Sequence, residues 1–293
     1  MYSQIASNKR KSIILAFLFV LIISGIAYAY SAFTGSYGIF IGVMVFAVVY
    51  ALVSYHFSAQ IALKIAGAQP IQKKDAPELY RIVENLSIAG GLPMPQVYII
   101  DDPSPNAFAT GRDPKHAVVA VTTGIMGILD KQELEGVIAH ELSHVGNYDI
   151  RFMAIVMVLV TVISLLSDAL LRIGIFGDED NNNPLAIVIM IAVAIIAPLI
   201  ALLLQLSVSR KREYLADASG ALLTRYPEGL AGALEKIEQA NKPLEHASSA
   251  NAHMYFSNPL AGKKKGSFIA GLFSTHPPID DRIKRLREME GKI

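Results

Sequence analysis

Long apolar runs dominate the hydrophobic pattern of the N-terminal part of the chain. Two of them, Ser12 to Tyr30 and Tyr37 to Tyr55, contain no charged residue. Each is long enough to cross a hydrocarbon core as a helix, which takes about 20 residues. Because only the short segment SAFTGS separates them, we expect a transmembrane hairpin in residues 1–55.

A second pair of apolar runs follows within residues 151–209. The run from Phe152 to Ser167 is short for a membrane span and is closed by Asp168, whereas the run from Leu185 to Ser209 is uncharged. A helical span can tilt or kink to match the thickness of the bilayer. We therefore expect these two runs to form a second transmembrane hairpin.

The chain outside the two hairpins, residues 56–150 and 210–293, mixes helical and strand patterns. PELYRIVENLSIAGGL has helical spacing and a glycine stop, whereas QVYIID and HAVVAVTTG are typical of short strands. A further helix is expected from Lys131 to about Asn147. The predicted fold class is α+β, mostly α: a multi-span membrane protein whose two polar parts form one domain.

Composition and charge agree with a membrane protein. The chain is 53% hydrophobic and only 17% charged, and its formal net charge of +1 gives no reason to expect nucleic acid as a partner. Basic residues near the span ends fall on one side of the membrane if all four runs cross it: Lys9, Arg10, Lys11, Lys64, Lys73, Lys74, Arg151, Arg210, Lys211 and Arg212. The positive-inside rule then places both termini and both polar parts in the cytoplasm.

The segment HELSH, from His140 to His144, fits the pattern H-E-x-x-H. Residues four apart share one face of a helix, so both imidazoles can bind one zinc ion, with Glu141 near the water that zinc would activate. Glu141 is then the expected general base. The alternative is a helix with two solvent-facing histidines. Asp149 follows this helix and could orient a ligand or Arg151, but a simple helix-end carboxylate is the favoured interpretation.

A third ligand is expected in SRKREYLADASG, because cysteine is absent and a metal must be held by His and carboxylate. Glu213 can supply that carboxylate. Asp217, one helical turn later, can accept a hydrogen bond from the free ring N–H of a histidine ligand. The alternative is a solvated charge cluster that Glu213 forms with the preceding basic residues at the membrane boundary.

Two further segments suggest roles in substrate binding and catalysis. One lies between the two strand-like runs, where the backbone could pair with an extended substrate or form an ordinary connecting loop. It comprises Asn106, Ala107, Phe108, Ala109 and Thr110. The other contains His276, a candidate donor to the oxyanion of a tetrahedral intermediate, or a cap of the helix expected near Pro278.

Four motifs occur in a characteristic order along the chain. They are PNAFATG (105–111), VIAHELSHVGNYD (137–149), SRKREYLAD (209–217) and STHPPIDDRIKRL (274–286). Together they resemble the HtpX-like integral membrane zinc metalloproteases, relatives of the CAAX prenyl protease. The resemblance implies a gluzincin-like domain, one zinc ion per chain on His140, His144 and Glu213, and Glu141 as general base. It also implies a prokaryotic inner-membrane enzyme that degrades misfolded or damaged membrane proteins in quality control.

The expected partners are membrane-protein substrates and the lipid bilayer, and assembly into a homo-oligomer is left open. One alternative is an intramembrane metalloprotease, but its motif should lie inside a hydrophobic span, whereas Lys131, Glu133 and Arg151 flank the motif here. The other alternative is a non-enzymatic scaffold or transporter. Ionisable residues inside the spans would favour it, and Asp168, at the end of one run, is the only such residue.

Overall fold

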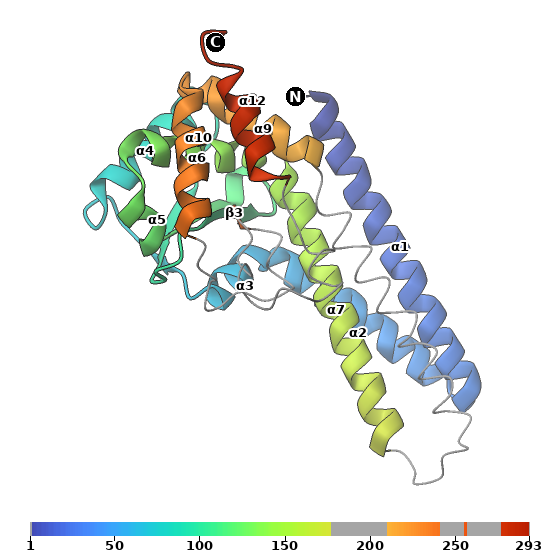
Figure 1. Cartoon of the computed structure of the whole chain (residues 1–293). Coiled ribbons are helices and arrows are strands. Elements are labelled where there is room, and N and C mark those ends of the chain that lie inside the picture. Colours follow the sequence, from blue (N-terminus) through green and yellow to red (C-terminus); the bar gives the residue numbers. More distant parts are fainter. Residues whose placement is uncertain (1, 177–209, 241–254, 257–276, 293) are drawn as a thin grey trace.

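The computed structural model describes residues 2–176, 210–240, 255–256 and 277–292 of the 293-residue chain. In Figure 1 the long helices α1 (Tyr2–Thr34), α2 (Tyr37–His56) and α7 (Asp149–Phe176) extend away from a compact part that holds the sheet and the shorter helices. The N- and C-termini lie at the same end of the molecule (Figure 1).

Helices α1 and α2 pack as a helical hairpin, whereas its crossing of a membrane stays a prediction. The turn between them contains Gly35, whose φ of +68° lies in the left-handed region that glycine adopts without steric cost. Helix α7 packs against both, and Phe19 of α1, Ala47 of α2 and Val156 of α7 belong to one buried apolar cluster. The three helices therefore form a bundle with its own core.

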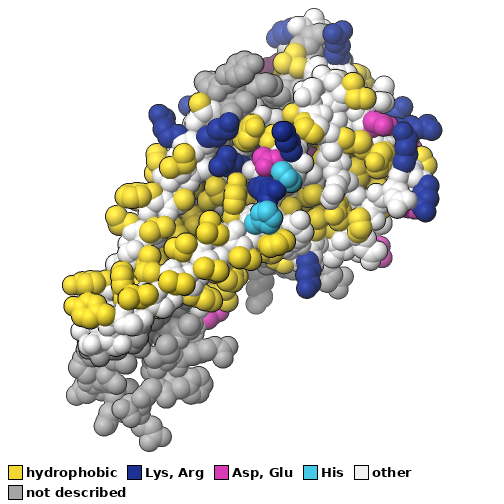
Figure 2. Space-filling view, turned by 180° about the vertical axis from the view of Figure 1, so that it is seen from behind, with side chains coloured by type: hydrophobic (Ala, Val, Ile, Leu, Met, Phe, Trp, Pro, Cys, Tyr) yellow, Lys and Arg dark blue, Asp and Glu magenta, His cyan; other side chains and the backbone are white. Residues whose placement is uncertain are grey.

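The outer surface of this bundle is apolar. Ile13, Phe17, Ile41 and Leu52 are each at least 60% exposed, and Figure 2 shows hydrophobic side chains covering the extended helical part on that face. Large contiguous apolar surfaces are rare on soluble monomers. The exposed face of the bundle therefore has the composition expected of a surface in contact with lipid.

In the part of the chain that the structure describes, between one and three candidate spans are long and apolar enough to cross a membrane. Helix α1 is long and apolar enough by itself, over Ala6–Tyr28. Helix α2 qualifies together with α3 (Ser58–Ile65), across a bend of 74°, and α7 qualifies together with α6 (Lys131–Gly146), across a bend of 76°. The run from Leu185 to Ser209 lies outside the described residues, so the second hairpin stays a prediction.

The sheet has four strands in the order β1-β2-β4-β3: β1 (Gln69–Pro70), β2 (Gln96–Ile100), β3 (Ala107–Gly111) and β4 (Ala117–Thr122). Strands β2 and β4 are parallel, and the other pairs are antiparallel. The strands expected in QVYIID and HAVVAVTTG are confirmed as β2 and β4. The segment between them is a strand and not a loop.

Strands β3 and β4 are buried on both faces. Ala109 and Val119 belong to the main core with residues of α6, whereas Phe108 and Ala120 on the opposite face pack with Leu63 of α3 and other residues of α3 and α7. Alternate side chains of a strand point to opposite faces, so one sheet lies between the helical core and the side of the molecule that holds α3 and α7. Strand β3 forms an edge of the sheet.

The remaining helices contribute side chains to the core that contains α6. They are α4 (Pro77–Ala89), α5 (Thr123–Ile128), α9 (Arg210–Thr224), α10 (Pro227–Ala240) and α12 (Ile279–Arg287), with a 3₁₀ turn at Pro114–His116. Leu230 of α10 and Leu286 of α12 are buried in the same core as Val137 of α6. Helices from both polar parts of the chain thus share one core, while the boundaries of the four expected segments stay predictions.

Helix α6 is fixed at both ends. Asp130 accepts hydrogen bonds from the backbone N–H groups of Gln132 and Glu133, and the Glu133 side chain accepts one from the N–H of Asp130, which forms a capping box. The helix ends at Gly146, close to the expected Asn147. The next residue but one, Tyr148, has a φ of +61° and lies in the bend before α7.

Candidate active site

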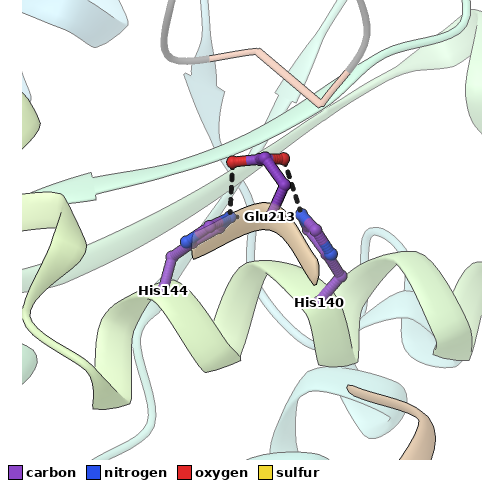
Figure 3. A group of neighbouring side chains, drawn as sticks. All are labelled: His140, His144 and Glu213. Carbon is purple, nitrogen blue, oxygen red and sulfur yellow. Dashed lines mark hydrogen bonds and ion pairs between the residues drawn. The ribbon is translucent and has the colours of Figure 1, made fainter. Parts of the chain in front are cut away.

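His140, His144 and Glu213 meet in one buried cluster. The two histidines project from one face of α6 toward Glu213 on α9 (Figure 3). His140 Nε2 lies 3.7 Å from Glu213 Oε2, and His144 Nε2 lies 3.7 Å from Glu213 Oε1. The three ligand atoms all lie within 4.8 Å of one another. The structure thus brings together the three residues that the sequence predicts as metal ligands.

Gly220 allows α9 to approach α6 closely at this point. A Cβ atom at Gly220 would lie 3.0 Å from the backbone nitrogen of His140 and 3.2 Å from its Cα. That is tighter than ordinary van der Waals contact, and neither atom can move independently of α6. Because Glu213 lies about two turns before Gly220 on the same helix, this close approach brings its carboxylate to the histidines.

His140 is oriented by an acidic side chain on α9. Its Nδ1 lies 3.0 Å from Asp217 Oδ1, the partner expected from the sequence. Burial lowers the pKa of His140 to about 4, although the hydrogen bond with Asp217 opposes this effect. The ring is therefore neutral near pH 7, with Nδ1–H directed to Asp217 and the lone pair of Nε2 directed to the cluster.

Asp217 is itself held by Arg282 of α12. Burial alone would raise the pKa of Asp217, but the Arg282 guanidinium and the hydrogen bond from His140 hold it at about 2. Arg282 is 1% exposed, and its guanidinium also lies over the ring of Phe256, 5.1 Å from the centroid. Arg282 is not distinguishable in the sequence as a site residue, because its segment has the charge pattern of an ordinary surface helix.

His144 has a corresponding partner in Asp149. Its Nδ1 lies 3.0 Å from Asp149 Oδ2. Burial alone would lower the pKa of His144, but the hydrogen bond to Asp149 and the charge of Glu213 raise it to about 9. This contact corrects the favoured interpretation of Asp149 as a simple helix-end carboxylate and supports the alternative that it orients a ligand. The contact arises because the 76° bend turns the start of α7 back toward His144.

Glu141 lies between the cluster and the sheet. It is buried, and its Oε2 accepts a hydrogen bond from the backbone N–H of Ala109 on β3 at 2.8 Å. Its position next to His140 on α6 directs the carboxylate to the edge strand. The carboxylate can therefore face a peptide that lies along β3.

The expected substrate strand is an edge strand, but part of its edge is already occupied. The backbone N–H of Phe256 donates to the carbonyl of Ala107 at 2.8 Å, and the ring of Phe256 packs edge-to-face on His140 with centroids 5.1 Å apart. Asn106 precedes the strand, and its carbonyl accepts from the N–H of Thr122. His276 lies outside the described residues.

The donor set fits a metal ion. Two imidazole nitrogens and one carboxylate are the combination found in catalytic zinc sites, which leave a further position open for water or substrate. The ligand atoms converge and are buried, and the outer ring nitrogen of each histidine lies 3.0 Å from a carboxylate, as metal-bound histidines require. The converging ligand atoms and the two carboxylate partners are therefore consistent with a bound metal ion.

Comparison with known proteins agrees with this geometry. Residues 73–290 match the family described as Peptidase family M48. A protein named Protease HtpX homolog from Tropheryma whipplei (strain Twist) is 50% identical over 291 residues, which is 99% of this chain and 98% of that protein. A protein of the same name from Dictyoglomus thermophilum is 46% identical over 295 residues, covering 98% of this chain and 94% of that protein.

A solved structure shares the fold. The crystal structure of S. mikatae Ste24p aligns with 98% of this chain and 67% of that chain, with a TM-score of 0.55 and 21% sequence identity. The similarity therefore extends over the helical bundle as well as the compact part.

Proposed function

Because the chain belongs to peptidase family M48 and is a membrane-associated metallopeptidase, we propose that His140, His144 and Glu213 bind zinc. We propose further that the enzyme hydrolyses peptide bonds of misfolded or damaged membrane proteins at the cytoplasmic face of the membrane. The observation that carries the proposal is the convergence of the three ligand atoms within 4.8 Å, with Glu141 adjacent on the same helix.

Glu141 is the proposed general base. Zinc, when bound, would acidify a water molecule and polarise the scissile carbonyl. The Glu141 carboxylate takes a proton from the attacking water while the water oxygen bonds to the carbonyl carbon. It then delivers a proton to the amide nitrogen as the C–N bond breaks. The Ala109 N–H, which donates to Glu141 Oε2 at 2.8 Å, keeps the carboxylate in place for both transfers.

Strand β3 is the proposed binding site for an extended substrate. An edge strand offers backbone groups to an added strand, which gains affinity without a requirement for particular side chains. Such binding suits an enzyme that accepts many unfolded segments. The carbonyl of Ala107 would have to exchange the N–H of Phe256 for that of the substrate.

The catalytic step is tested by replacing Glu141. We expect Glu141→Gln to reduce cleavage of an unfolded membrane protein by at least about 100-fold, since the amide keeps the size and loses the proton acceptor. Glu135→Gln, on the same helix but partly exposed beside Lys131, serves as the matched control and should cleave at the wild-type rate. Cleavage by Glu141→Gln at the rate of this control would show that Glu141 is not the base.

The cytoplasmic location is tested separately. The chain contains no cysteine, so any introduced cysteine is its only thiol. In intact cells, an impermeant maleimide added outside should label Ser36→Cys, in the turn between α1 and α2, and spare Lys131→Cys at the start of α6. Both variants should be labelled once the membrane is opened. Labelling of Lys131→Cys from outside would mean that the orientation is inverted.

A further inference from the structure

The first turns of α1 carry a polar side chain that is buried against the active site. Asn8 is 2% exposed, although three basic residues follow it directly in the sequence. Its Nδ2 donates to Asp149 Oδ1 at 2.6 Å and to the backbone carbonyl of Asn147 at 3.0 Å. These bonds join residues about 140 positions apart in the chain. The N-terminal part of α1 is thereby fixed to the C-terminal end of α6.

The contact covers the whole bend between α6 and α7. Asn147 ends α6, Asp149 begins α7, and between them Tyr148 has a φ of +61°, which is uncommon for a residue with a side chain. Lys9, next to Asn8, lies over the ring of Tyr148, with Nζ 4.6 Å from the centroid. Helix α1 thus contacts three consecutive residues of a strained bend.

The same bend holds one metal ligand. Asp149 uses one carboxylate oxygen for Asn8 and the other for the Nδ1 of His144, at 3.0 Å. Arg212, at 3.9 Å from Asp149 Oδ1, supplies positive charge from α9. Because a buried carboxylate with one fixed oxygen has little rotational freedom, the direction in which Asp149 presents its second oxygen depends on Asn8.

We propose that Asn8 is a positioning residue for the metal site: it fixes Asp149, Asp149 orients His144, and the N-terminal helix thereby sets the affinity for the metal. This inference rests on the proposed metal site. Helix α1 is also the described helix that is long and apolar enough to span a membrane by itself. The position of that helix in the bilayer is therefore coupled to the metal site through two hydrogen bonds.

The coupling has a defined range. A slide of α1 by one helical turn is about 5.4 Å, which removes Asn8 from hydrogen-bond distance of Asp149. Loss of a carboxylate partner behind a metal-bound histidine lowers metal affinity by about 10 to 100-fold. Since Asn8 acts through Asp149 and not on the histidine itself, we expect the lower end of that range.

The test measures zinc affinity by competition with a chelator, using the full-length protein in detergent. Asn8→Ala should raise the Kd for zinc by about 10-fold. Ser12→Ala is the matched control, because Ser12 lies one turn further along α1, is also 2% exposed, and its hydroxyl has no hydrogen-bond partner among the described residues. This variant should bind zinc as the wild type does. Combined with Asp149→Ala, Asn8→Ala should have no further effect, since the two residues act in one chain.

Three results would overturn the inference. They are wild-type zinc affinity in Asn8→Ala, an equal loss of affinity in Ser12→Ala, and a full effect of Asn8→Ala in the Asp149→Ala background. The second result would indicate a general effect of α1 packing, and the third an effect that bypasses Asp149. A wild-type protein that binds no zinc would instead refute the proposed function, so the two failures are distinguishable.

Discussion

Arg282 holds Asp217 through two hydrogen bonds, from Nε to Oδ2 at 2.9 Å and from Nη2 to Oδ1 at 2.7 Å. Asp217 in turn contacts His140 Nδ1 at 3.0 Å. Helix α12, near the C-terminus, thus supports one histidine of the cluster, as Asp149 supports the other. Each histidine has its own carboxylate, and each carboxylate is fixed by a residue that is distant in the sequence.

Removal of Arg282 should destabilise the protein. Arg282→Met keeps the length of the side chain but leaves the Asp217 carboxylate buried without its cationic partner, which costs about 3 to 5 kcal/mol in comparable buried pairs. We expect a clear fall in the midpoint of thermal unfolding, followed by circular dichroism. Arg287→Met, on the same helix, breaks only exposed ion pairs with Glu228 and Glu235 and should leave the midpoint nearly unchanged. Equal midpoints for the two variants would contradict the structural role of Arg282.

Removal of the Asp217 carboxylate should mainly weaken metal binding. Asp217→Ala removes the acceptor for His140 Nδ1, so we expect zinc affinity to fall by about 10 to 100-fold. Asp280→Ala, a carboxylate at the start of α12 that is not fully buried, is a suitable control and should bind zinc normally. An unchanged Kd in a folded Asp217→Ala protein would show that His140 does not depend on this carboxylate.

The close approach of α9 to α6 should depend on Gly220. A methyl group there meets the backbone of His140 at 3.0 Å, so Gly220→Ala should push the helices apart, move Glu213 away from the histidines and lower zinc binding. Gly127→Ala, in helix α5, has no atom within 4 Å of the added Cβ and should have no such effect. Normal zinc content in Gly220→Ala would show that zinc binding does not depend on this close approach of α9 to α6.

Release of Phe256 should favour substrate binding if β3 is the substrate strand. Burial of the Phe256 ring anchors the N–H that occupies the Ala107 carbonyl, so Phe256→Ala should lower KM for an extended peptide. It should also lower the thermal midpoint, because loss of a buried Phe costs about 3 to 5 kcal/mol. Tyr255→Phe keeps the ring that packs on Phe108 and should leave KM unchanged. A higher KM for Phe256→Ala would show that Phe256 helps to form the binding site.

The helix that carries the two histidines could be predicted, because the signals for it lie within its own stretch of sequence. The i, i+4 spacing of His140 and His144 requires only that the segment is helical, and Asp130 and Glu133 provide the signals for its start. Strands β2 and β4 were predictable for the same reason, since their apolar runs lie between turn residues. The short elements α3 and β1 were missed, because neither has enough residues to establish a periodic pattern.

The supporting residues could not be predicted because their positions depend on tertiary structure. Asp149 contacts His144 only through the bend at Tyr148, and helical spacing would place it on another side of the helix. Arg282 and Asn8 come from opposite ends of the chain. A buried asparagine in a basic, membrane-proximal segment gives no signal of its own until its partner is known.

The most direct test of the account is the zinc content of the purified protein, measured by elemental mass spectrometry. We predict a single zinc ion per chain in the wild type and in Glu141→Gln, which keeps all three ligands, and a strong loss in Glu213→Ala. Glu135→Ala, which removes a partly exposed carboxylate from α6, controls for the loss of charge and should keep its zinc. Full zinc content in Glu213→Ala would contradict the assignment of His140, His144 and Glu213 as the metal site.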